Sequence, residues 1–253
     1  MNKEKIKKER NIIMLKIQNL TKTYKGGKTA VSNLSLEVKE GNIYGFIGHN
    51  GAGKTTTIKS VAGIHDFDEG EIFIDGVSIK DNPLLCKEKI SYIPDNPDLY
   101  EYLTGIQYLN FLADIYKISK DEREKRIKNE AENFGILESL GDLISSYSHG
   151  MKQKLAIIGA LLHDPKLLIL DEPFVGLDPE ATLMLKDKMH ELCEKGSAIF
   201  FSTHVLDVAE KLCSHVAIIS HGRLVLDGET KVLTKEKSLE QLFMEVATHD
   251  KAD

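Results

Sequence analysis

The chain has 253 residues, of which 42% are hydrophobic and 28% are charged, and its formal net charge is -6. This length suits one large globular domain, or a core domain that carries an inserted subdomain. The apolar content excludes an intrinsically disordered chain. The longest uninterrupted stretch of apolar or small residues, 155–162, is far shorter than the roughly 20 residues that cross a bilayer, so we expect any membrane role to depend on a partner.

Cysteine usage and charge narrow the class further. Cys86, Cys193 and Cys213 are widely spaced and form no metal-ligand or redox motif, which favours reduced thiols in a cytoplasmic protein. The acidic net charge argues against a nucleic-acid partner. Residues 1–13 are lysine-rich and are expected to form a disordered tail, with an amphipathic membrane-surface segment as the alternative.

The first part of the chain alternates strands with one helix. Apolar residues alternate at 15–17 and at 34–38, which predicts two strands. The apolar run 43–47 predicts a buried strand, and a glycine-rich turn and a predicted helix over 55–62 follow it. Residues 71–79 predict a hairpin that turns at an Asp-Gly pair.

The middle of the chain is predicted to be helical. Thr104 and Gln107 fit a capping box, in which a hydroxyl and a later side chain satisfy free N–H groups at a helix start. Ser119 and Glu122 fit a second capping box, which opens a charged helix. We therefore expect a helical insertion over about 95–150.

The rest of the chain returns to strands. The apolar runs 167–170 and 198–202 predict two buried strands, which a helix beginning near Asp178 separates. A hairpin is predicted over 216–226. Strands that alternate with helices imply an α/β fold with a mainly parallel sheet.

These elements predict one domain over residues 14–230, with the helical insertion as its subdomain. Residues 231–253 are expected to form a C-terminal helical tail, because the stretch 239–246 is amphipathic. Packing of this tail into the core is the simplest role for it.

Eight residues between a predicted strand and a predicted helix match the pattern G-x-x-x-x-G-K-T, namely Gly48, His49, Asn50, Gly51, Ala52, Gly53, Lys54 and Thr55. The backbone N–H groups of such a loop, and the start of the helix, form a nest for phosphate oxygens. We expect Lys54 to reach the β- and γ-phosphates, Thr55 to offer its hydroxyl to Mg²⁺, and Thr56 to bind the α-phosphate. The alternative is a glycine-rich turn without a ligand, which the flanking strand and helix disfavour.

Asp171 and Glu172 directly follow the apolar strand 167–170. The carboxyl ends of parallel strands face the ligand crevice of an α/β sheet, so Asp171 is expected to serve Mg²⁺. Glu172 is expected to orient the water that attacks the γ-phosphorus. The alternative is a solvated acidic pair that caps the next turn. His204 ends the next core strand and is expected to stabilise charge on the γ-phosphate, which makes Lys54, Glu172 and His204 the candidate catalytic residues.

Residues 147–153, YSHGMKQ, resemble the signature motif of ABC ATPases, which is usually written LSGGQ. Ser148 and Gly150 match this motif, whereas positions 147, 149 and 151 depart from it. The resemblance covers nearly the whole chain from Leu15 onward. It implies a P-loop NTPase (RecA-like) core with a mainly parallel sheet, an N-terminal antiparallel β subdomain and an inserted α-helical subdomain.

The same resemblance implies ATP and Mg²⁺ as ligands and adds three candidate residues. Tyr24 stands where the family stacks an aromatic ring on adenine, and Asp178 stands in the loop after the paired acids. Asp95 replaces the usual glutamine. A carboxylate also ligates Mg²⁺, but this side chain is one methylene shorter and carries charge. The simpler alternative for Tyr24 is a half-buried strand tyrosine, and the simpler alternative for Asp178 is a helix-capping residue.

The resemblance further implies a head-to-tail homodimer or heterodimer, in which Ser148 and Gly150 of one copy close on the γ-phosphate held by the other. It implies a transmembrane permease subunit as partner, on the cytoplasmic, inner face of the cell membrane, and ATP hydrolysis that drives transport. The stretch 93–105 and the signature variant resemble exporter ATPases. The alternatives are an ABC ATPase of translation or DNA repair, a nucleotide-binding regulator with weak hydrolysis, and a P-loop kinase.

Overall fold

The computed structural model of the chain describes residues 12–249. Residues 1–11 of the expected N-terminal tail lie outside the described residues, and Ile13, at the end of that tail, already belongs to the first strand. The C-terminal residues 250–253 also lie outside the described range.

The N-terminal part of the chain forms an antiparallel sheet, sheet A, with the strand order β2-β1-β4-β5. The strands are β1 (Ile13–Thr23), β2 (Thr29–Lys39), β4 (Glu69–Ile74) and β5 (Val77–Ser78). The predicted Asp-Gly hairpin joins β4 to β5. The expected N-terminal antiparallel subdomain is therefore confirmed.

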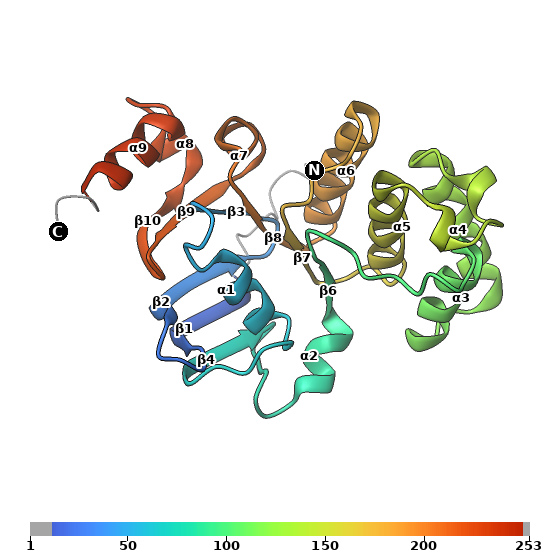
Figure 1. Cartoon of the computed structure of the whole chain (residues 1–253), viewed down its shortest axis with the longest axis horizontal. Helices are drawn as coiled ribbons and strands as arrows, with labels where there is room; N and C mark the ends of the chain where they lie inside the picture. The colour runs from blue at the N-terminus through green and yellow to red at the C-terminus, as the bar shows by residue number, and fades with distance from the viewer. Residues whose placement is uncertain (1–11, 250–253) are drawn as a thin grey trace, which may run out of the picture.

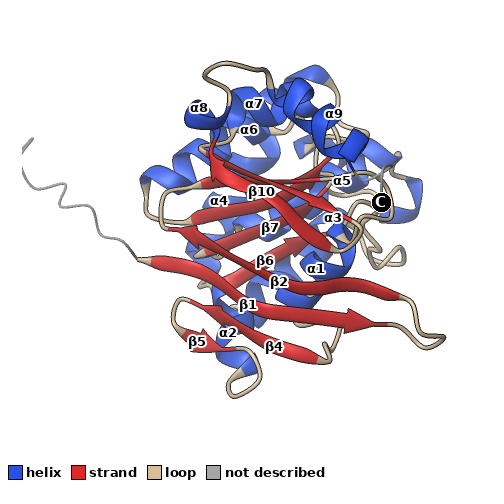
Figure 2. Cartoon of the chain, turned by 90° about the vertical axis from the view of Figure 1, so that its left-hand side faces the viewer, coloured by secondary structure: helices blue, strands red, loops and turns tan. Residues whose placement is uncertain are grey.

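A six-stranded sheet, sheet B, has the order β10-β9-β3-β8-β7-β6. Its strands are β3 (Ile43–Ile47), β6 (Ile90–Ile93), β7 (Leu167–Asp171), β8 (Ala198–Thr203), β9 (His215–Ser220) and β10 (Arg223–Glu229). Neighbours from β9 to β6 are parallel, whereas β10 is antiparallel to β9. The prediction of a mainly parallel sheet is confirmed, and Figure 2 shows β1 and β4 of sheet A below β6 and β7 of sheet B.

Helices cover sheet B and form the insertion. They are α1 (Lys54–Val61), α2 (Pro83–Lys89), α3 (Gly105–Ile115), α4 (Lys120–Asn133), α5 (His149–Leu161), α6 (Pro179–Glu194), α7 (Leu206–Leu212), α8 (Thr230–Leu233) and α9 (Leu239–His249), with short 3-10 turns at Leu137–Ser139 and Ile144–Ser146. Figure 1 shows α3, α4 and α5 gathered at one end of the molecule, beyond β6 and β7. The expected helical subdomain is therefore present.

Local sequence explains the helix starts in this subdomain. Thr104 and Gln107 form the predicted capping box, because each side chain accepts a hydrogen bond from the backbone N–H of the other residue. At α4, Ser119 Oγ accepts a hydrogen bond from Glu122 N at 3.4 Å, but the Glu122 carboxylate bonds to a residue other than Ser119. The Glu122 carboxylate instead lies 2.7 Å from Arg126 Nε, one turn along the helix.

Helix α2 has no counterpart among the sequence predictions. Its seven residues bury the side chain of Cys86 but leave Leu84 and Leu85 exposed. Such a segment has no apolar stripe at helical spacing, which is the pattern that sequence reasoning relies on. Its position is set by the strand that follows it.

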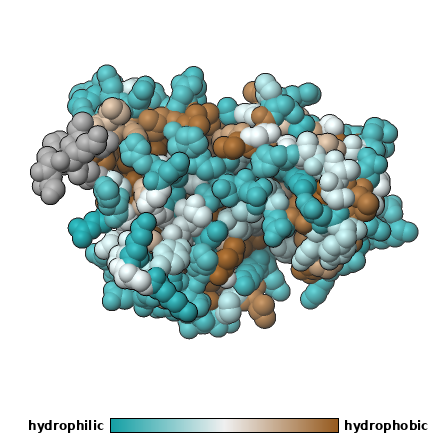
Figure 3. All heavy atoms as spheres, viewed as in Figure 1, coloured by the Kyte–Doolittle hydropathy of each residue, from teal (hydrophilic) through white to brown (hydrophobic). Residues whose placement is uncertain are grey.

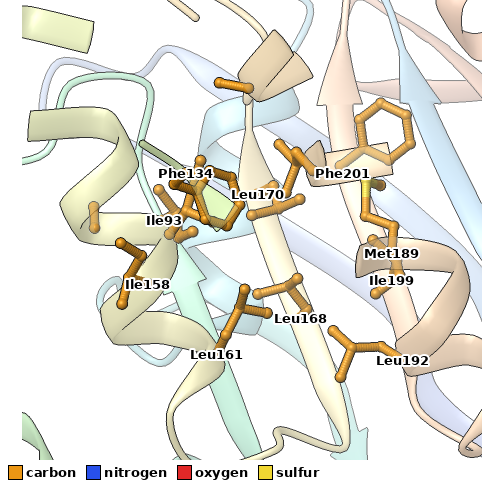
Figure 4. Packing of buried hydrophobic residues seen from close by; sticks show 14 of the residues in the cluster. Ile93, Phe134, Ile158, Leu161, Leu168, Leu170, Met189, Leu192, Ile199 and Phe201 are labelled. Atoms are coloured by element: carbon orange, nitrogen blue, oxygen red, sulfur yellow. The ribbon is translucent and has the colours of Figure 1, made fainter. Parts of the chain in front are cut away.

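Sheet B is buried on both faces. Successive residues of a strand point to opposite faces, and in β7 Leu168 and Leu170 join one apolar cluster whereas Leu167 and Ile169 join the other. Figure 4 shows the first cluster, in which side chains from α5 and α6 pack around Leu168 and Leu170. The second cluster lies between sheets A and B and includes residues of α1. This double coverage explains the continuous apolar runs in the sequence.

Two further features of the described residues are the length of their helices and the state of their cysteines. Within residues 12–249, no helix has both the length and the apolar character needed to cross a membrane. Cys86, Cys193 and Cys213 carry free thiols, and burial raises the pKa of the Cys193 thiol to about 12. These thiols are therefore poor nucleophiles at neutral pH.

Phe134 ends α4, is 2% exposed, and lies beside Ile93 and Leu170 in Figure 4. It thus ties the helical subdomain to sheet B. We expect Phe134→Ala to lower the free energy of unfolding by about 3–5 kcal/mol, because it removes buried apolar area and leaves a cavity. Urea denaturation followed by circular dichroism measures this change. Leu84→Ala is the control, since Leu84 is 77% exposed, and equal unfolding midpoints for the two variants would contradict the prediction.

Candidate functional site

The candidate site lies at the carboxyl edge of sheet B, where parallel strands end together. Strand β3 leads into the glycine-rich loop, β7 ends at Asp171, and β8 ends one residue before His204. A cavity of about 280 Å³ opens beside the loop. The residues that line it are Tyr24, Lys28, Ala30, His49, Asn50, Gly51, Gly53, Lys54, Thr55, Thr56, Asp95, Asp171 and Glu172. Most of the residues predicted for phosphate, adenine and metal are thus brought together.

Glycines shape the loop before α1. Gly53 precedes the helix with a φ of 110°, and a Cβ atom there would lie 2.5 Å from the carbonyl oxygen of Ala30. A Cβ atom on Gly48 would lie 2.6 Å from the carbonyl oxygen of Ile219. Larger residues would therefore push the loop away from both sheets. In the described chain no side chain caps α1, so the N–H groups of its first turn point to an anion site.

Lys54 places a charge inside this loop. Its side chain is 6% exposed, and Nζ donates hydrogen bonds to the carbonyl oxygens of Gly48 at 2.6 Å and His49 at 3.3 Å. The same Nζ lies 3.6 Å from Glu172 Oε1. The loop and the edge of strand β7 therefore hold a nearly buried cation between them. A lysine cation of this kind can bind phosphate oxygens.

Asp171 has a carboxylate oxygen in need of a partner. The residue is 1% exposed, its Oδ1 accepts a hydrogen bond from Ser202 Oγ, and its Oδ2 is buried without a hydrogen-bond partner. A buried carboxylate oxygen without a partner is costly, and a cation removes that cost. Thr55 and Asp95 line the same cavity and supply further hard oxygen atoms. This donor set fits Mg²⁺.

The acids and histidines of residues 12–249 form no cluster of three or more with metal-ligating geometry. A metal ion at Asp171 would thus be held by few acidic side chains of the described residues. Mg²⁺ is bound in this way in nucleotide sites, through one or two protein oxygens, substrate phosphates and water.

Glu172 is held in an unusual backbone conformation. Its φ is 48°, a left-handed value that costs energy for a residue with a side chain. Its backbone N–H donates to Ser202 Oγ at 3.1 Å, and its Oε2 accepts a hydrogen bond from His204 N at 3.3 Å. His204 Nδ1 lies 2.9 Å from the same Oε2. A carboxylate only accepts, so the proton is on Nδ1 and Nε2 is left as the other ring atom that can meet a ligand.

Tyr24 presents a ring at the rim of the cavity. It is 40% exposed, and its hydroxyl lies 3.2 Å from Thr56 Oγ1. The ring also makes an edge contact with His65, with centroids 6.2 Å apart. Its exposed area and its link to the loop fit a stacking platform next to the phosphate nest.

Tyr92 is a feature that sequence reasoning missed. Its hydroxyl is buried without a hydrogen-bond partner. Burial raises the pKa of this phenol, and the negative charges of Asp171 and Asp95 raise it further. The phenol therefore stays protonated beside the two candidate metal ligands. In the sequence it is a strand residue between Ser91 and Ile93, and the pairing of β6 with β7 places it opposite Ile169, close enough to feel the charge of Asp171 although it does not line the site cavity.

Six predicted residues lie outside the cavity lining. Gly48 and Ala52 belong to the loop itself, and His204 contacts Glu172, whereas the other three lie at the starts of α5 and α6. Ser148 caps α5 and accepts a hydrogen bond from Met151 N at 3.3 Å. A Cβ atom on Gly150 would lie 2.9 Å from the carbonyl oxygen of Gly176. Asp178 caps α6 through a 2.8 Å hydrogen bond from Ala181 N, so the simpler reading of a helix cap also holds. Within one chain, Ser148, Gly150 and Asp178 therefore do not line the phosphate loop's own cavity.

The C-terminal helix reaches the phosphate loop. Leu239, at the start of α9, is fully buried and its N–H donates to Glu210 Oε2 at 2.7 Å. Further along α9, the ring of Phe243 lies 4.5 Å from the ring of His49, measured between centroids. This part of the tail therefore packs into the core, and Figure 3 shows apolar side chains gathered over this side of the molecule, at the upper left.

Comparisons with known proteins give a consistent picture. A sequence model of the family described as ABC transporter matches residues 31–175. The ABC-type transporter ATP-binding protein EcsA of Bacillus subtilis (strain 168) is 35% identical over 245 residues, which cover 94% of this chain and 98% of the relative. The uncharacterized ABC transporter ATP-binding protein YhcH of the same organism is 37% identical and covers 84% and 68%. The linearmycin resistance ATP-binding protein LnrL, also of Bacillus subtilis (strain 168), is 36% identical over 85% of this chain and 69% of the relative.

Solved structures agree in fold. An ATP-binding subunit of an ABC transporter is 35% identical, with a TM-score of 0.88 over 92% of this chain and 99% of that chain. CbiO1 from Clostridium perfringens, part of the ABC transporter complex cbiONQ, is 30% identical with a TM-score of 0.76, covering 89% and 92%. The ATP-binding cassette MJ0796, a dimer bound to ADP and Pi, is 26% identical with a TM-score of 0.76, covering 86% and 99%.

The position of Lys54 generates a binding prediction. We expect Lys54→Ala to weaken the binding of a fluorescent ATP analogue by about tenfold or more, because it removes the cation that meets the phosphates. Equilibrium fluorescence titration measures this affinity. Lys80→Ala is the control, since the Lys80 side chain is 45% exposed, pairs with Glu71 and does not line the cavity. Equal affinities for the two variants would remove Lys54 from the site.

Proposed function

Because the chain belongs to the ABC transporter ATP-binding proteins, we propose that it hydrolyses ATP with Mg²⁺ at the interface of a head-to-tail dimer and so drives an exporter permease. The observation that carries the hydrolytic part is the meeting of Lys54, Asp171 and the Glu172–His204 pair at one cavity. A phosphate nest alone would support binding. The acid and histidine beside it add the groups that activate water.

In this proposal the chain binds ATP along the cavity from Tyr24 to Asp171. The adenine stacks on Tyr24, and the loop N–H groups and Lys54 bind the phosphates. Thr56 adds a hydroxyl at the α-phosphate. Thr55, Asp171 and Asp95 are the residues that would hold Mg²⁺, which when bound neutralises phosphate charge. The buried, unpartnered Oδ2 of Asp171 supports this assignment.

Glu172 is the proposed general base. Its Oε2 is engaged by His204, so Oε1 is the oxygen that would accept a proton from the attacking water. Lys54 Nζ lies 3.6 Å from Oε1, so a positive charge stands beside that oxygen. His204 holds the acid in place through Nδ1 and directs Nε2 to the γ-phosphate, where it would stabilise developing charge.

A second chain completes the site in this proposal. Ser148 and Gly150 lie outside the cavity of their own chain, at the N-terminus of α5, which is a favourable place for an anion. They would close on the γ-phosphate held by another copy, or by a related ATPase in a heterodimer. The dimeric state of the MJ0796 relative with ADP and Pi supports this arrangement.

The helical subdomain supplies a surface for the permease. Tyr100, Tyr102 and Phe111 are 47%, 75% and 43% exposed, and both Tyr102 and Phe111 contact the Tyr100 ring. We define these three residues as the aromatic cluster. Exposed aromatic groups of this kind mark protein interaction sites. The permease would thereby hold the chain on the cytoplasmic, inner face of the cell membrane, and membership of the cbiO1 relative in a transporter complex supports such a partner.

The export direction rests on likeness to exporter ATPases. The signature variant SHGMKQ and the stretch 93–105 are of that type, and the LnrL relative is named for resistance to linearmycin. Resistance to a toxic compound is a natural outcome of its export. Transport substrates are selected by the permease, so this chain is proposed to supply energy alone.

Hydrolysis is tested by Glu172→Gln. We expect ATP binding to persist and steady-state turnover to fall by about a hundredfold or more, because the amide accepts no proton. The variant is also expected to accumulate as an ATP-bound dimer, which light scattering coupled to gel filtration detects. Glu88→Gln, on the exposed face of α2, is the control. Unchanged turnover in Glu172→Gln would remove Glu172 from its role.

Docking is tested by Tyr102→Ala. We expect it to reduce co-purification of the multispanning membrane subunit from detergent extracts by about fivefold, because exposed aromatic anchors carry much of the energy of interfaces. Basal ATP hydrolysis of the isolated chain should remain unchanged. Leu84→Ala removes a similarly exposed apolar side chain, at 77% exposure, on α2 rather than on the helical subdomain, and serves as control. Equal retention by both variants would place the permease elsewhere.

A further inference from the structure

The signature turn and the loop before α6 pack directly on each other within one chain. Lys154 Nζ, one turn into α5, lies 2.6 Å from Asp178 Oδ2. Gly176 has a φ of 82°, and a Cβ atom there would lie 2.5 Å from Cδ2 of the His149 ring. Together with the approach of Gly150 to the Gly176 carbonyl oxygen, these contacts join two segments that are far apart in the sequence. Figure 1 shows α5 and α6 side by side on the sheet.

The ion pair fixes both partners in a defined geometry. Asp178 uses Oδ1 to cap α6 and Oδ2 to meet Lys154, so both oxygens are engaged. The Lys154 side chain is 16% exposed, and that of Asp178 is 49% exposed. The hydrogen bond from Ala181 N and the charge of Lys154 lower the pKa of the Asp178 carboxyl, so it is ionised at neutral pH.

We infer that Lys154 is a positioning residue, which docks the N-terminus of α5 on the start of α6 and thereby aims Ser148 and Gly150 at the partner's nucleotide. This inference rests on the proposed dimer. The signature turn, with Ser148 and Gly150, opens α5 of the helical subdomain, whereas α6 packs on sheet B. An anchor between them limits the orientations that the turn adopts before closure.

The physical basis is preorganisation. The free energy of dimer closure is less favourable if the groups that bind the phosphate must first be ordered. The Lys154–Asp178 pair orders them in advance. Loss of this pair therefore weakens association in the presence of ATP, while it leaves the phosphate loop, which binds nucleotide in the single chain, as it is.

The chain offers a matched control in Lys188. Its Nζ lies 2.7 Å from Glu130 Oε1, and the two side chains are 15% and 14% exposed. This pair also joins α6 to the helical subdomain, but it does so through α4, well along α6 from the signature turn. Lys188→Ala thus removes an ion pair whose lysine is as buried as Lys154 and whose acid is more buried than Asp178, between the same two parts of the molecule.

The experiment uses the full chain with Glu172→Gln as the parent, so that ATP is not consumed. Dimer dissociation constants in saturating Mg-ATP are measured by sedimentation velocity, and nucleotide affinity is measured with the fluorescent ATP analogue at concentrations where the chain is monomeric. Adding Lys154→Ala should weaken the dimer by about tenfold and change nucleotide affinity by less than about twofold. Lys154→Arg should restore the dimer, and Lys188→Ala should leave it within about twofold of the parent.

Asp178→Asn provides a second route, because asparagine retains the helix cap but lacks the charge. It should weaken the dimer as Lys154→Ala does, and combining the two changes should add nothing further. Equal dimerisation of Lys154→Ala and the parent would overturn the inference alone. Equal weakening by Lys188→Ala would do the same, since the effect would then be general loss of stability. A parent that never dimerises with ATP would overturn the proposed homodimer and this inference with it.

Discussion

The burial of opposite charges at the edge of an apolar sheet is the constraint on which the rest of the structure depends. Lys54 and Asp171 are 6% and 1% exposed; Lys54 opens α1 after the loop that follows β3, and Asp171 ends the fully buried strand β7. Isolated charges in such a place are unfavourable. The fold offsets part of that cost through the loop carbonyls around Lys54 and through Ser202, whose hydroxyl binds Asp171. The remaining imbalance, an unpartnered carboxylate oxygen beside a nest of N–H groups, is the binding energy that a metal-bound polyphosphate would recover.

This arrangement explains which parts of the site the sequence predicts. The phosphate loop and the acids after β7 are local patterns, and a strand that is apolar on both faces leaves no doubt about where it ends. Tyr92 and the contact of His49 with Phe243 are non-local. They depend on strand order and on the packing of the tail, and no spacing in the sequence reports either. Helix α2 was missed for a related reason, since its exposed Leu84 breaks the helical pattern.

The helical subdomain separates binding from completion. Its helices begin at sequence-defined caps, such as Thr104, and its core is tied to sheet B by Phe134. This geometry carries Ser148 to the start of α5, outside the cavity that its own chain forms. Under the proposed function, such a chain would hold two halves of a reaction centre in different places, and its activity would depend on association. The aromatic cluster lies on the same subdomain as Ser148.

The departures from the common signature fall where physics permits them. A Cβ atom on Gly150 would lie only 2.9 Å from the carbonyl oxygen of Gly176, and Ser148 must cap α5, so both positions are restricted. Position 149 is not confined in this way. His149 lies over Gly176, which has no side chain, and fills that space with a ring. The His149 ring adds a packing contact between the signature turn and the loop before α6. The Lys154–Asp178 ion pair joins the same two segments through charge. A signature that departs from the common form thus keeps the donors and reinforces their support.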